Sequence, residues 1–205
     1  MEHIYHKGDS NRPIYLLFHG TGGNEHDLVP IKHKIDPNAG YISFRGDVNE
    51  HGALRFFKRI KPGLFDEEDL IKRTYSMIER IKLLSKQYQF SLKQVIALGY
   101  SNGANLIASM LFHDNTLFKR VVLYHPMIPI KNLGLPPQKD LQLLIGAGIN
   151  DPIVPKQEVK TLVSMFKASE ATLKVHWTNQ GHHITEELVL ETQRWVEMTC
   201  KKETN

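Results

Sequence analysis

Short apolar runs alternate with longer amphipathic stretches along most of this chain. The short runs are rich in β-branched and aromatic residues, which predicts strands at residues 14–19, 41–45, 94–100, 120–125, 141–147 and 172–177. Because these runs are mostly apolar throughout, they suit a sheet that is buried on both faces. The amphipathic stretches predict helices at Glu67–Gln87, Asn102–Phe112, Lys156–Ser169 and Thr185–Cys200.

Strands that alternate with helices in this way predict an α/β fold. We expect a mostly parallel central sheet with helices on both faces, joined by right-handed crossovers. No internal repeat and no linker-like composition interrupts the pattern, so we expect a single domain over residues 1–205.

Two longer stretches, residues 46–66 and 126–139, fall outside this alternation. Loops longer than about a dozen residues are usually functional or disordered, and these two hold too many apolar residues to suit disorder. They suit the walls of a substrate pocket, the contact surface of a homodimer, or packing beside the main core. The candidate pocket residues from the first stretch are Leu54, Phe56, Phe57 and Phe65. The second stretch is too short for a large lid.

Charge and cysteine content narrow the class of protein. Lys and Arg exceed Asp and Glu by 26 − 22 = 4, and the excess is spread along the chain. Nucleic acid would require a clustered basic stripe, so we expect no such partner. No apolar run approaches the roughly 20 residues that span a bilayer, which predicts no membrane insertion. The single cysteine, Cys200, fits a reducing compartment, and we expect a cytoplasmic protein.

Candidate chemistry begins at residues 99–103, GYSNG, a G-x-S-x-G sequence at the junction of a predicted strand and a predicted helix. In that setting a sharp turn raises the serine above the sheet edge, and the two glycines leave room for a strained backbone. The helix dipole also favours an oxyanion that develops there. Ser101 is therefore a candidate nucleophile, and a glycine-rich turn with a serine cap is the alternative.

A serine nucleophile needs a base and a group that orients the base. Asp151 follows a predicted strand in the stretch GINDPIVP, and two adjacent histidines follow the last predicted strand. Serine, acid and histidine in this chain order are typical of α/β-hydrolases. Asp151 is therefore the candidate acid, although alone it would also suit a turn or a helix cap.

Only one histidine of the adjacent pair can face Ser101, because neighbouring residues of an extended loop point in roughly opposite directions. Gly181 allows the turn that brings His182 over the strand ends. His183 precedes Thr185, which has the character of a helix N-cap, so its ring should lie on the surface or against the helix start. We predict that His182 is the base. Adjacent histidines without further ligands do not suggest a metal site.

The loop HGTGG, residues 19–23, follows the first predicted strand and matches the glycine-rich turn that supplies an oxyanion donor in such enzymes. We expect the two donors to be the backbone amides of Thr21 and Asn102. His19 lies in the same turn, where we expect its ring to bond nearby backbone in a structural role.

The chain resembles the phospholipase/carboxylesterase family of serine α/β-hydrolases, which includes the acyl-protein thioesterases. The likeness extends from near residue 13 to near residue 197 through HGTGGNEHDL, GYSNGANLIASML, GINDPIVP and GHHITEEL, and is closest to short bacterial carboxylesterases. It implies a catalytic triad of Ser101, Asp151 and His182. Many thioesterase members have Gln after the nucleophile and often Leu in the oxyanion loop. This chain has Asn102 and Thr21, which disfavours long acyl-protein substrates.

We therefore expect a carboxylesterase that cleaves small soluble esters through an acyl-enzyme, with no metal and no organic cofactor. A thioesterase or a lactone hydrolase with the same serine is the alternative among enzymes. A binding protein that has lost catalysis on a hydrolase fold is the alternative outside them.

Overall fold

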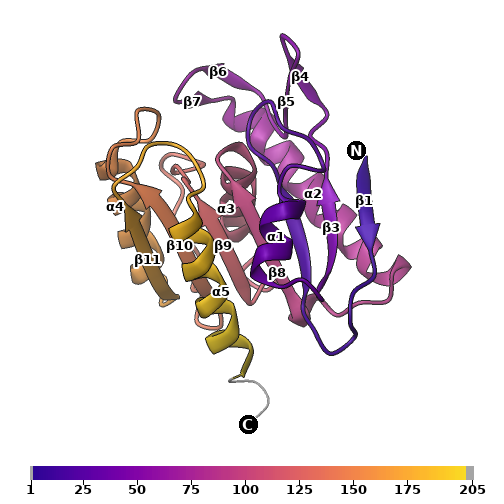
Figure 1. Cartoon of the computed structure of the whole chain (residues 1–205). Coiled ribbons are helices and arrows are strands. Elements are labelled where there is room, and N and C mark those ends of the chain that lie inside the picture. The colour runs from indigo at the N-terminus through magenta and orange to yellow at the C-terminus, as the bar shows by residue number, and fades with distance from the viewer. Residues whose placement is uncertain (1, 202–205) are drawn as a thin grey trace.

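The computed structural model describes residues 2–201, and its centre is a seven-stranded sheet (Figure 1). The strands are β1 (His3–His6), β2 (Ile14–Phe18), β3 (Gly40–Phe44), β8 (Val95–Tyr100), β9 (Arg120–Tyr124), β10 (Gln142–Gly148) and β11 (Thr172–Thr178). They lie in the order β1-β3-β2-β8-β9-β10-β11, and every neighbouring pair is parallel except β1 with β3. The predicted mostly parallel sheet is confirmed.

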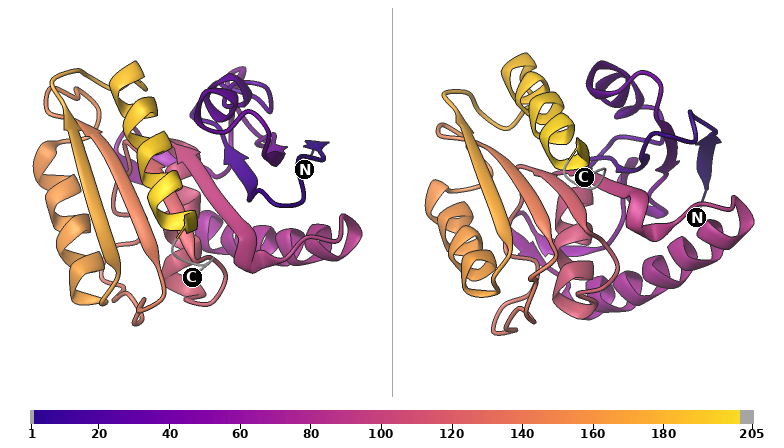
Figure 2. Two further views of the ribbon diagram at one scale, coloured as in Figure 1. Left: turned by 60° about the horizontal axis from the view of Figure 1, so that its bottom comes forward. Right: turned by 90° about the horizontal axis from the view of Figure 1, so that it is seen from below.

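Helices cover both faces of this sheet (Figure 2). On one face lie α1 (Val29–Ile35) and α5 (Glu186–Lys201), and on the other lie α2 (Glu67–Gln87), α3 (Asn102–His113) and α4 (Lys156–Ala168). Strand β2 shows the result, because Leu16 and Phe18 pack with α2 and α3 while Tyr15 and Leu17 pack toward α1 and α5. All four side chains are buried, as the apolar runs predict for a sheet between two helical layers.

Side-chain caps begin two of the predicted helices. The Asp66 side chain accepts a hydrogen bond from the Asp69 amide at 3.0 Å and begins α2. The Thr185 hydroxyl accepts from the Leu188 amide at 3.2 Å and begins α5, as predicted. Sequence periodicity missed the edge strand β1 and the helix α1, because each is too short to establish a period. Among residues 2–201, no helix combines the length and apolarity that crossing a membrane requires.

Residues 46–66 are ordered into two hairpins, which corrects the expectation of an irregular stretch. They are β4 (Val48–Glu50) with β5 (Ala53–Arg55), and β6 (Arg59–Lys61) with β7 (Leu64–Phe65). Positive φ angles at His51, Gly52 and Gly63 allow the tight reversals. Residues 126–139 form turns without a helix or strand, so no large lid is built there.

Candidate active site

Ser101 occupies a strained turn between β8 and α3, with φ 51° and ψ −111°. A positive φ is unfavourable for any residue with a side chain, and such strain is concentrated at functional sites. The neighbouring glycines make the turn sterically feasible. A Cβ atom on Gly103 would lie 2.1 Å from the Phe18 carbonyl oxygen, and one on Gly99 would lie 2.7 Å from the Ala104 nitrogen. The sequence-predicted serine turn is therefore present.

The structure brings Ser101, His182 and Asp151 into one hydrogen-bonded chain. His182 Nε2 lies 2.9 Å from Ser101 Oγ, and His182 Nδ1 lies 2.7 Å from Asp151 Oδ2. Each residue follows the carboxyl end of a parallel strand, namely β8, β11 and β10 in that order. The side chains of His182 and Asp151 are 10% and 2% exposed. This arrangement can move a proton from the serine hydroxyl to an imidazole whose other nitrogen faces a carboxylate.

Asp151 is held as an ionised acceptor. Its Oδ1 accepts hydrogen bonds from the Ile153 amide at 2.8 Å and the Val154 amide at 2.9 Å. Burial by itself raises the pKa of the Asp151 carboxyl, but the hydrogen bonds from Val154, His182 and Ile153 outweigh burial, so the pKa lies below its usual value. The group therefore stays charged at neutral pH.

The two adjacent histidines face different surroundings, as predicted. His182 packs against the ring of Tyr100, and the Tyr100 hydroxyl donates a hydrogen bond to the His182 carbonyl at 2.7 Å. His183 is exposed and lies just before the Thr185 cap. Tyr100, the residue before Ser101, therefore holds His182 in place through both its ring and its hydroxyl.

A third histidine, His125, was missed by sequence reasoning. It follows β9 directly, its side chain is 1% exposed, and its Nδ1 lies 2.9 Å from Asp151 Oδ2. His125, Asp151 and His182 together could hold a metal ion by distance alone. Both Nδ1 atoms, however, face the same carboxylate oxygen at hydrogen-bonding distance, which suits two N–H donors. A histidine at the carboxyl end of a predicted parallel strand was the available signal.

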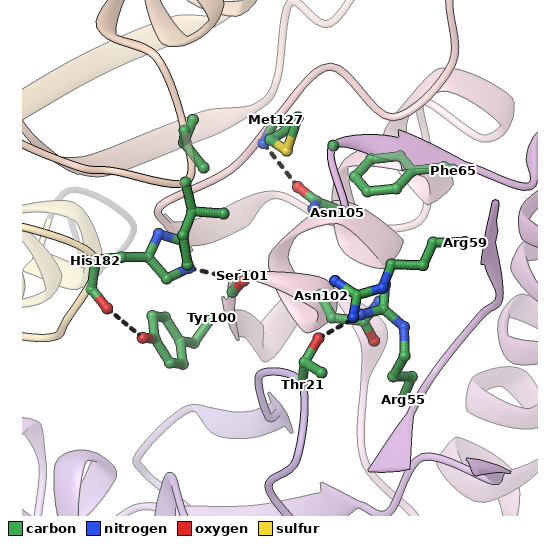
Figure 3. A pocket seen from close by; sticks show the side chains of 13 residues that line it. Thr21, Arg55, Arg59, Phe65, Tyr100, Ser101, Asn102, Asn105, Met127 and His182 are labelled. Atoms are coloured by element: carbon green, nitrogen blue, oxygen red, sulfur yellow. Dashed lines mark hydrogen bonds between the residues drawn. The ribbon is translucent and has the colours of Figure 1, made fainter. Parts of the chain in front are cut away.

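A cavity of about 230 Å³ opens beside Ser101 (Figure 3). Besides Ser101 and His182, its wall is formed by Thr21, Arg55, Arg59, Gly63, Phe65, Tyr100, Asn102, Asn105, Met127, Ile153 and Val154. Of the candidate pocket residues, Phe65 lines this cavity. Leu54, Phe56 and Phe57 do not, and the last two are fully buried in the core. The segment is too short for its pattern of apolar residues to show which side chains face the cavity. The sequence therefore could not distinguish Phe65 from the other three candidates.

Two arginines that the sequence analysis did not single out form the cavity wall away from His182, with Ser101 between (Figure 3). Arg55 is 3% exposed and lies 3.3 Å from Glu50, which also accepts a 2.8 Å bond from Arg59. Burial, then the charge of Arg59, lowers the pKa of Arg55 to about 10. The hydrogen bond from Arg59 lowers the pKa of Glu50. At neutral pH two cations therefore share one anion.

Thr21 and Asn102, the expected oxyanion donors, both line the cavity with Ser101. The Thr21 amide makes no hydrogen bond to another residue of the described chain. The Asn102 amide opens α3, where no intrahelical acceptor exists. Both N–H groups are therefore available to a ligand. The Thr21 hydroxyl accepts a 2.6 Å bond from Arg55, which links this loop to the arginines.

His19 has the structural role that we predict. Its Nδ1 lies 2.6 Å from the Gly20 carbonyl, and its Nε2 accepts the Gly46 amide at 2.9 Å. Burial lowers its pKa, which keeps the ring neutral and able to accept at Nε2. The His19 ring therefore connects residues 19–23 to the start of residues 46–66.

Comparisons with known proteins identify the family of this chain. The sequence model of the dienelactone hydrolase family matches residues 3–187. The putative hydrolase MhqD of Bacillus subtilis (strain 168) is 44% identical over 195 residues, which cover 95% of this chain and 97% of that protein.

Solved structures extend the likeness. A carboxylesterase from Bacillus cereus has a TM-score of 0.94 at 42% identity, covering 97% of this chain and 94% of that one. The structure of YahD with malic acid has a TM-score of 0.91 at 30% identity, covering 97% and 98%. The prediction of an α/β-hydrolase related to carboxylesterases is confirmed, and this chain belongs to the dienelactone hydrolase family.

Proposed function

We propose that this protein is a serine ester hydrolase that works through an acyl-enzyme formed on Ser101. The observation that carries the proposal is the chain from Ser101 Oγ to His182 Nε2 at 2.9 Å and from His182 Nδ1 to Asp151 at 2.7 Å, at the mouth of a cavity. Family membership supports hydrolysis, and the carboxylesterase from Bacillus cereus supports an ester as the bond that is cleaved.

In the first step, His182 takes the Ser101 proton as Oγ bonds to the ester carbonyl carbon. The carbonyl oxygen becomes an oxyanion, which the amides of Thr21 and Asn102 stabilise. The intermediate collapses, the alcohol leaves with the proton from His182, and the acyl group stays on Ser101. Water then gives a proton to His182 as its oxygen bonds to the acyl carbon. The bond between that carbon and Oγ breaks, His182 returns the proton to Ser101 Oγ, and the acid leaves. Asp151 holds the imidazole in the required tautomer and stabilises its cation.

The matched test replaces two serines. Ser101→Ala should lower kcat on an activated ester by about 10⁴-fold or more, whereas the exposed Ser10→Ala should leave it unchanged. A fluorophosphonate probe should label folded wild-type protein once, on Ser101. Both variants should melt near the parent, because the Ser101 hydroxyl contributes little packing. Activity of Ser101→Ala within tenfold of the parent, or an adduct elsewhere, would exclude Ser101 as nucleophile.

A thioesterase and a lactone hydrolase with the same serine remain the alternative reactions. Matched oxygen esters, thioesters and lactones distinguish them by kcat/KM. A binding protein without catalysis is supported if the probe forms no adduct with folded protein.

The cavity wall further favours an ester that carries a carboxylate. Arg55 and Arg59 bring two positive charges to the cavity, the single carboxylate of Glu50 lies between them, and Glu50 is not part of the wall. An anionic substrate group would balance the remaining charge, and guanidinium groups bind carboxylates with two parallel hydrogen bonds. The malic acid in the structure of the relative YahD supports the same preference.

Arg59→Gln tests this preference, with the exposed Arg194→Gln of α5 as a control that changes net charge equally. The first pair of substrates is the neutral 4-nitrophenyl valerate and the anionic 4-nitrophenyl glutarate. A second pair also has a neutral and an anionic member, and its anionic member carries the carboxylate on the alcohol. In Arg59→Gln, kcat/KM for at least one of the anionic esters should fall by about tenfold or more, which is the effect expected from losing one hydrogen bond to a charged group. The neutral esters should change less than twofold. Equal loss on neutral and anionic esters would argue against an anion site.

Cellular and assembly assignments are part of the proposal. We propose that the protein acts in the cytoplasm as a single domain and without nucleic-acid partners. Sedimentation analysis would distinguish a monomer from a homodimer. The finding that no described helix could cross a membrane is compatible with these proposals.

A further inference from the structure

We propose that His125 is a positioning residue that shares the acid with His182 and thereby weakens the attraction between Asp151 and a protonated His182. This inference rests on the proposed function, in which His182 is the base and Asp151 its partner. Among the described residues, the His125 ring makes its hydrogen-bonding contacts with Asp151 and the His183 carbonyl and not with Ser101, so it acts through Asp151.

The backbone at His125 indicates that its placement is specific. The residue directly follows β9 and has a φ of 52°, and its amide donates to the Gly146 carbonyl of the neighbouring strand β10 at 2.7 Å. A left-handed backbone is unfavourable for histidine, and a buried imidazole loses its hydration. Contacts of the ring must offset both costs.

The ring contacts lead to one oxygen atom. Asp151 Oδ2 lies 2.9 Å from His125 Nδ1 and 2.7 Å from His182 Nδ1, and the centres of the two rings are 4.9 Å apart. The other oxygen, Oδ1, is taken by the amides of Ile153 and Val154. The two histidines therefore donate to the same oxygen, because no second oxygen of Asp151 is free for either of them.

The second ring nitrogen reaches the loop of the base. His125 Nε2 lies 3.0 Å from the carbonyl oxygen of His183, the residue after His182. The titratable groups that face the His125 ring in the described chain are Asp151 from the loop after β10, His182 from the loop after β11, and Tyr100 from β8. Burial lowers the pKa of His125, so the neutral ring has one proton, and the carboxylate holds it on Nδ1.

The shared Asp151 oxygen affects how strongly the acid attracts His182. A second N–H donor stabilises the negative charge on Oδ2 whether His182 is neutral or protonated. It therefore weakens the additional attraction between Asp151 and the His182 cation. Loss of the His125 donor should therefore strengthen this attraction and move the acid limb of the pH profile to higher pH.

Two amide substitutions separate the roles of the two ring nitrogens. In His125→Asn the side-chain NH₂ lies near the position of Nδ1, and Asn tolerates a left-handed backbone well. This variant keeps a donor toward Asp151. In His125→Gln the NH₂ lies near the position of Nε2, so it faces the His183 carbonyl, and this variant removes the donor to Asp151.

The measurement is kcat/KM against pH on one activated ester. In His125→Gln, the midpoint of the acid limb should move to higher pH by about half a unit or more, the scale of one lost hydrogen bond to a carboxylate. Its kcat should fall by about tenfold through poorer orientation of the acid. His125→Asn should keep the midpoint of the parent. Thermal melting checks that both variants fold.

A role in packing alone would lower stability in both variants and leave the midpoint unchanged, and that result would overturn the inference. Should His125→Gln fail to fold, ¹⁵N chemical shifts of the wild-type histidines decide the question, because an unprotonated Nδ1 on His125 at neutral pH would refute the shared donor. Failure of the proposed function is distinguishable, because it appears in Ser101→Ala and in probe labelling, neither of which depends on His125.

Discussion

Two buried asparagines in the first turn of α3 attach two segments of the cavity wall to the helix that follows Ser101. Asn102 Oδ1 accepts the amide of Phe56 at 2.7 Å, and Asn105 Oδ1 accepts the amide of Met127 at 2.7 Å. Phe56 belongs to residues 46–66 and Met127 to residues 126–139. Each asparagine therefore aligns one of these two segments with Ser101. Its side-chain oxygen accepts a backbone N–H that would otherwise be buried without a partner.

The two adjacent histidines allow a sharp prediction at this scale. His182→Ala removes the ring that lies 2.9 Å from Ser101 Oγ, so kcat on an activated ester should fall by about 10⁴-fold or more. His183→Ala removes an exposed ring and should change kcat by only a small factor. Both variants should melt near the parent temperature. If His183→Ala were the inactive variant, the assignment of the base would be wrong.

At the scale of elements, residues 46–66 divide their aromatic side chains between the core and the cavity. Phe56 is fully buried and packs against Phe18 and His19 with ring centres 5.5 and 4.7 Å away. Phe65 lines the cavity, with its ring 5.1 Å from that of Phe57. Residues 46–66 thus form part of the cavity wall through Phe65 and part of the core through Phe56.

This division predicts opposite effects of two similar substitutions. Phe56→Ala should lower the free energy of unfolding by about 3–5 kcal/mol, because it leaves a large void in a close-packed core. Phe65→Ala should cost less stability and should instead alter KM across a series of esters of graded acyl length. Urea unfolding and steady-state kinetics measure the two effects. An unchanged KM series for Phe65→Ala would make the cavity wall irrelevant to substrate choice.

At the scale of the whole molecule, the parallel sheet gathers the site. The loop with Thr21 follows β2, and Ser101, His125, Asp151 and His182 follow β8, β9, β10 and β11. Parallel strands have their carboxyl ends at one edge, so residues that are distant in the chain meet there. Because β9 lies next to both β8 and β10, His125 comes between the strand that precedes Ser101 and the strand that precedes Asp151.

The sequence by itself determined the features that depend on local pattern and chain order. The serine turn is contiguous, so a strand, two glycines and a helix identified Ser101 without knowledge of the fold. Asp151 and His182 could be placed because any polar residue just beyond a parallel strand reaches the same edge of the sheet. Gly181 and the Thr185 cap then separated His182 from His183, since turn and cap preferences act over a few residues.

Tertiary structure alone decided which residues surround Ser101, Asp151 and His182. The inward or outward direction of Phe56 and Phe65 depends on how short hairpins pack, and such segments carry no period long enough to read. The pairing of Arg55 and Arg59 with Glu50 depends on the hairpin register and on burial, neither of which local composition encodes. His125 meets Asp151 because β9 and β10 are neighbours in the sheet. Strand order is a property of the whole packed molecule, whereas sequence pattern describes each strand separately.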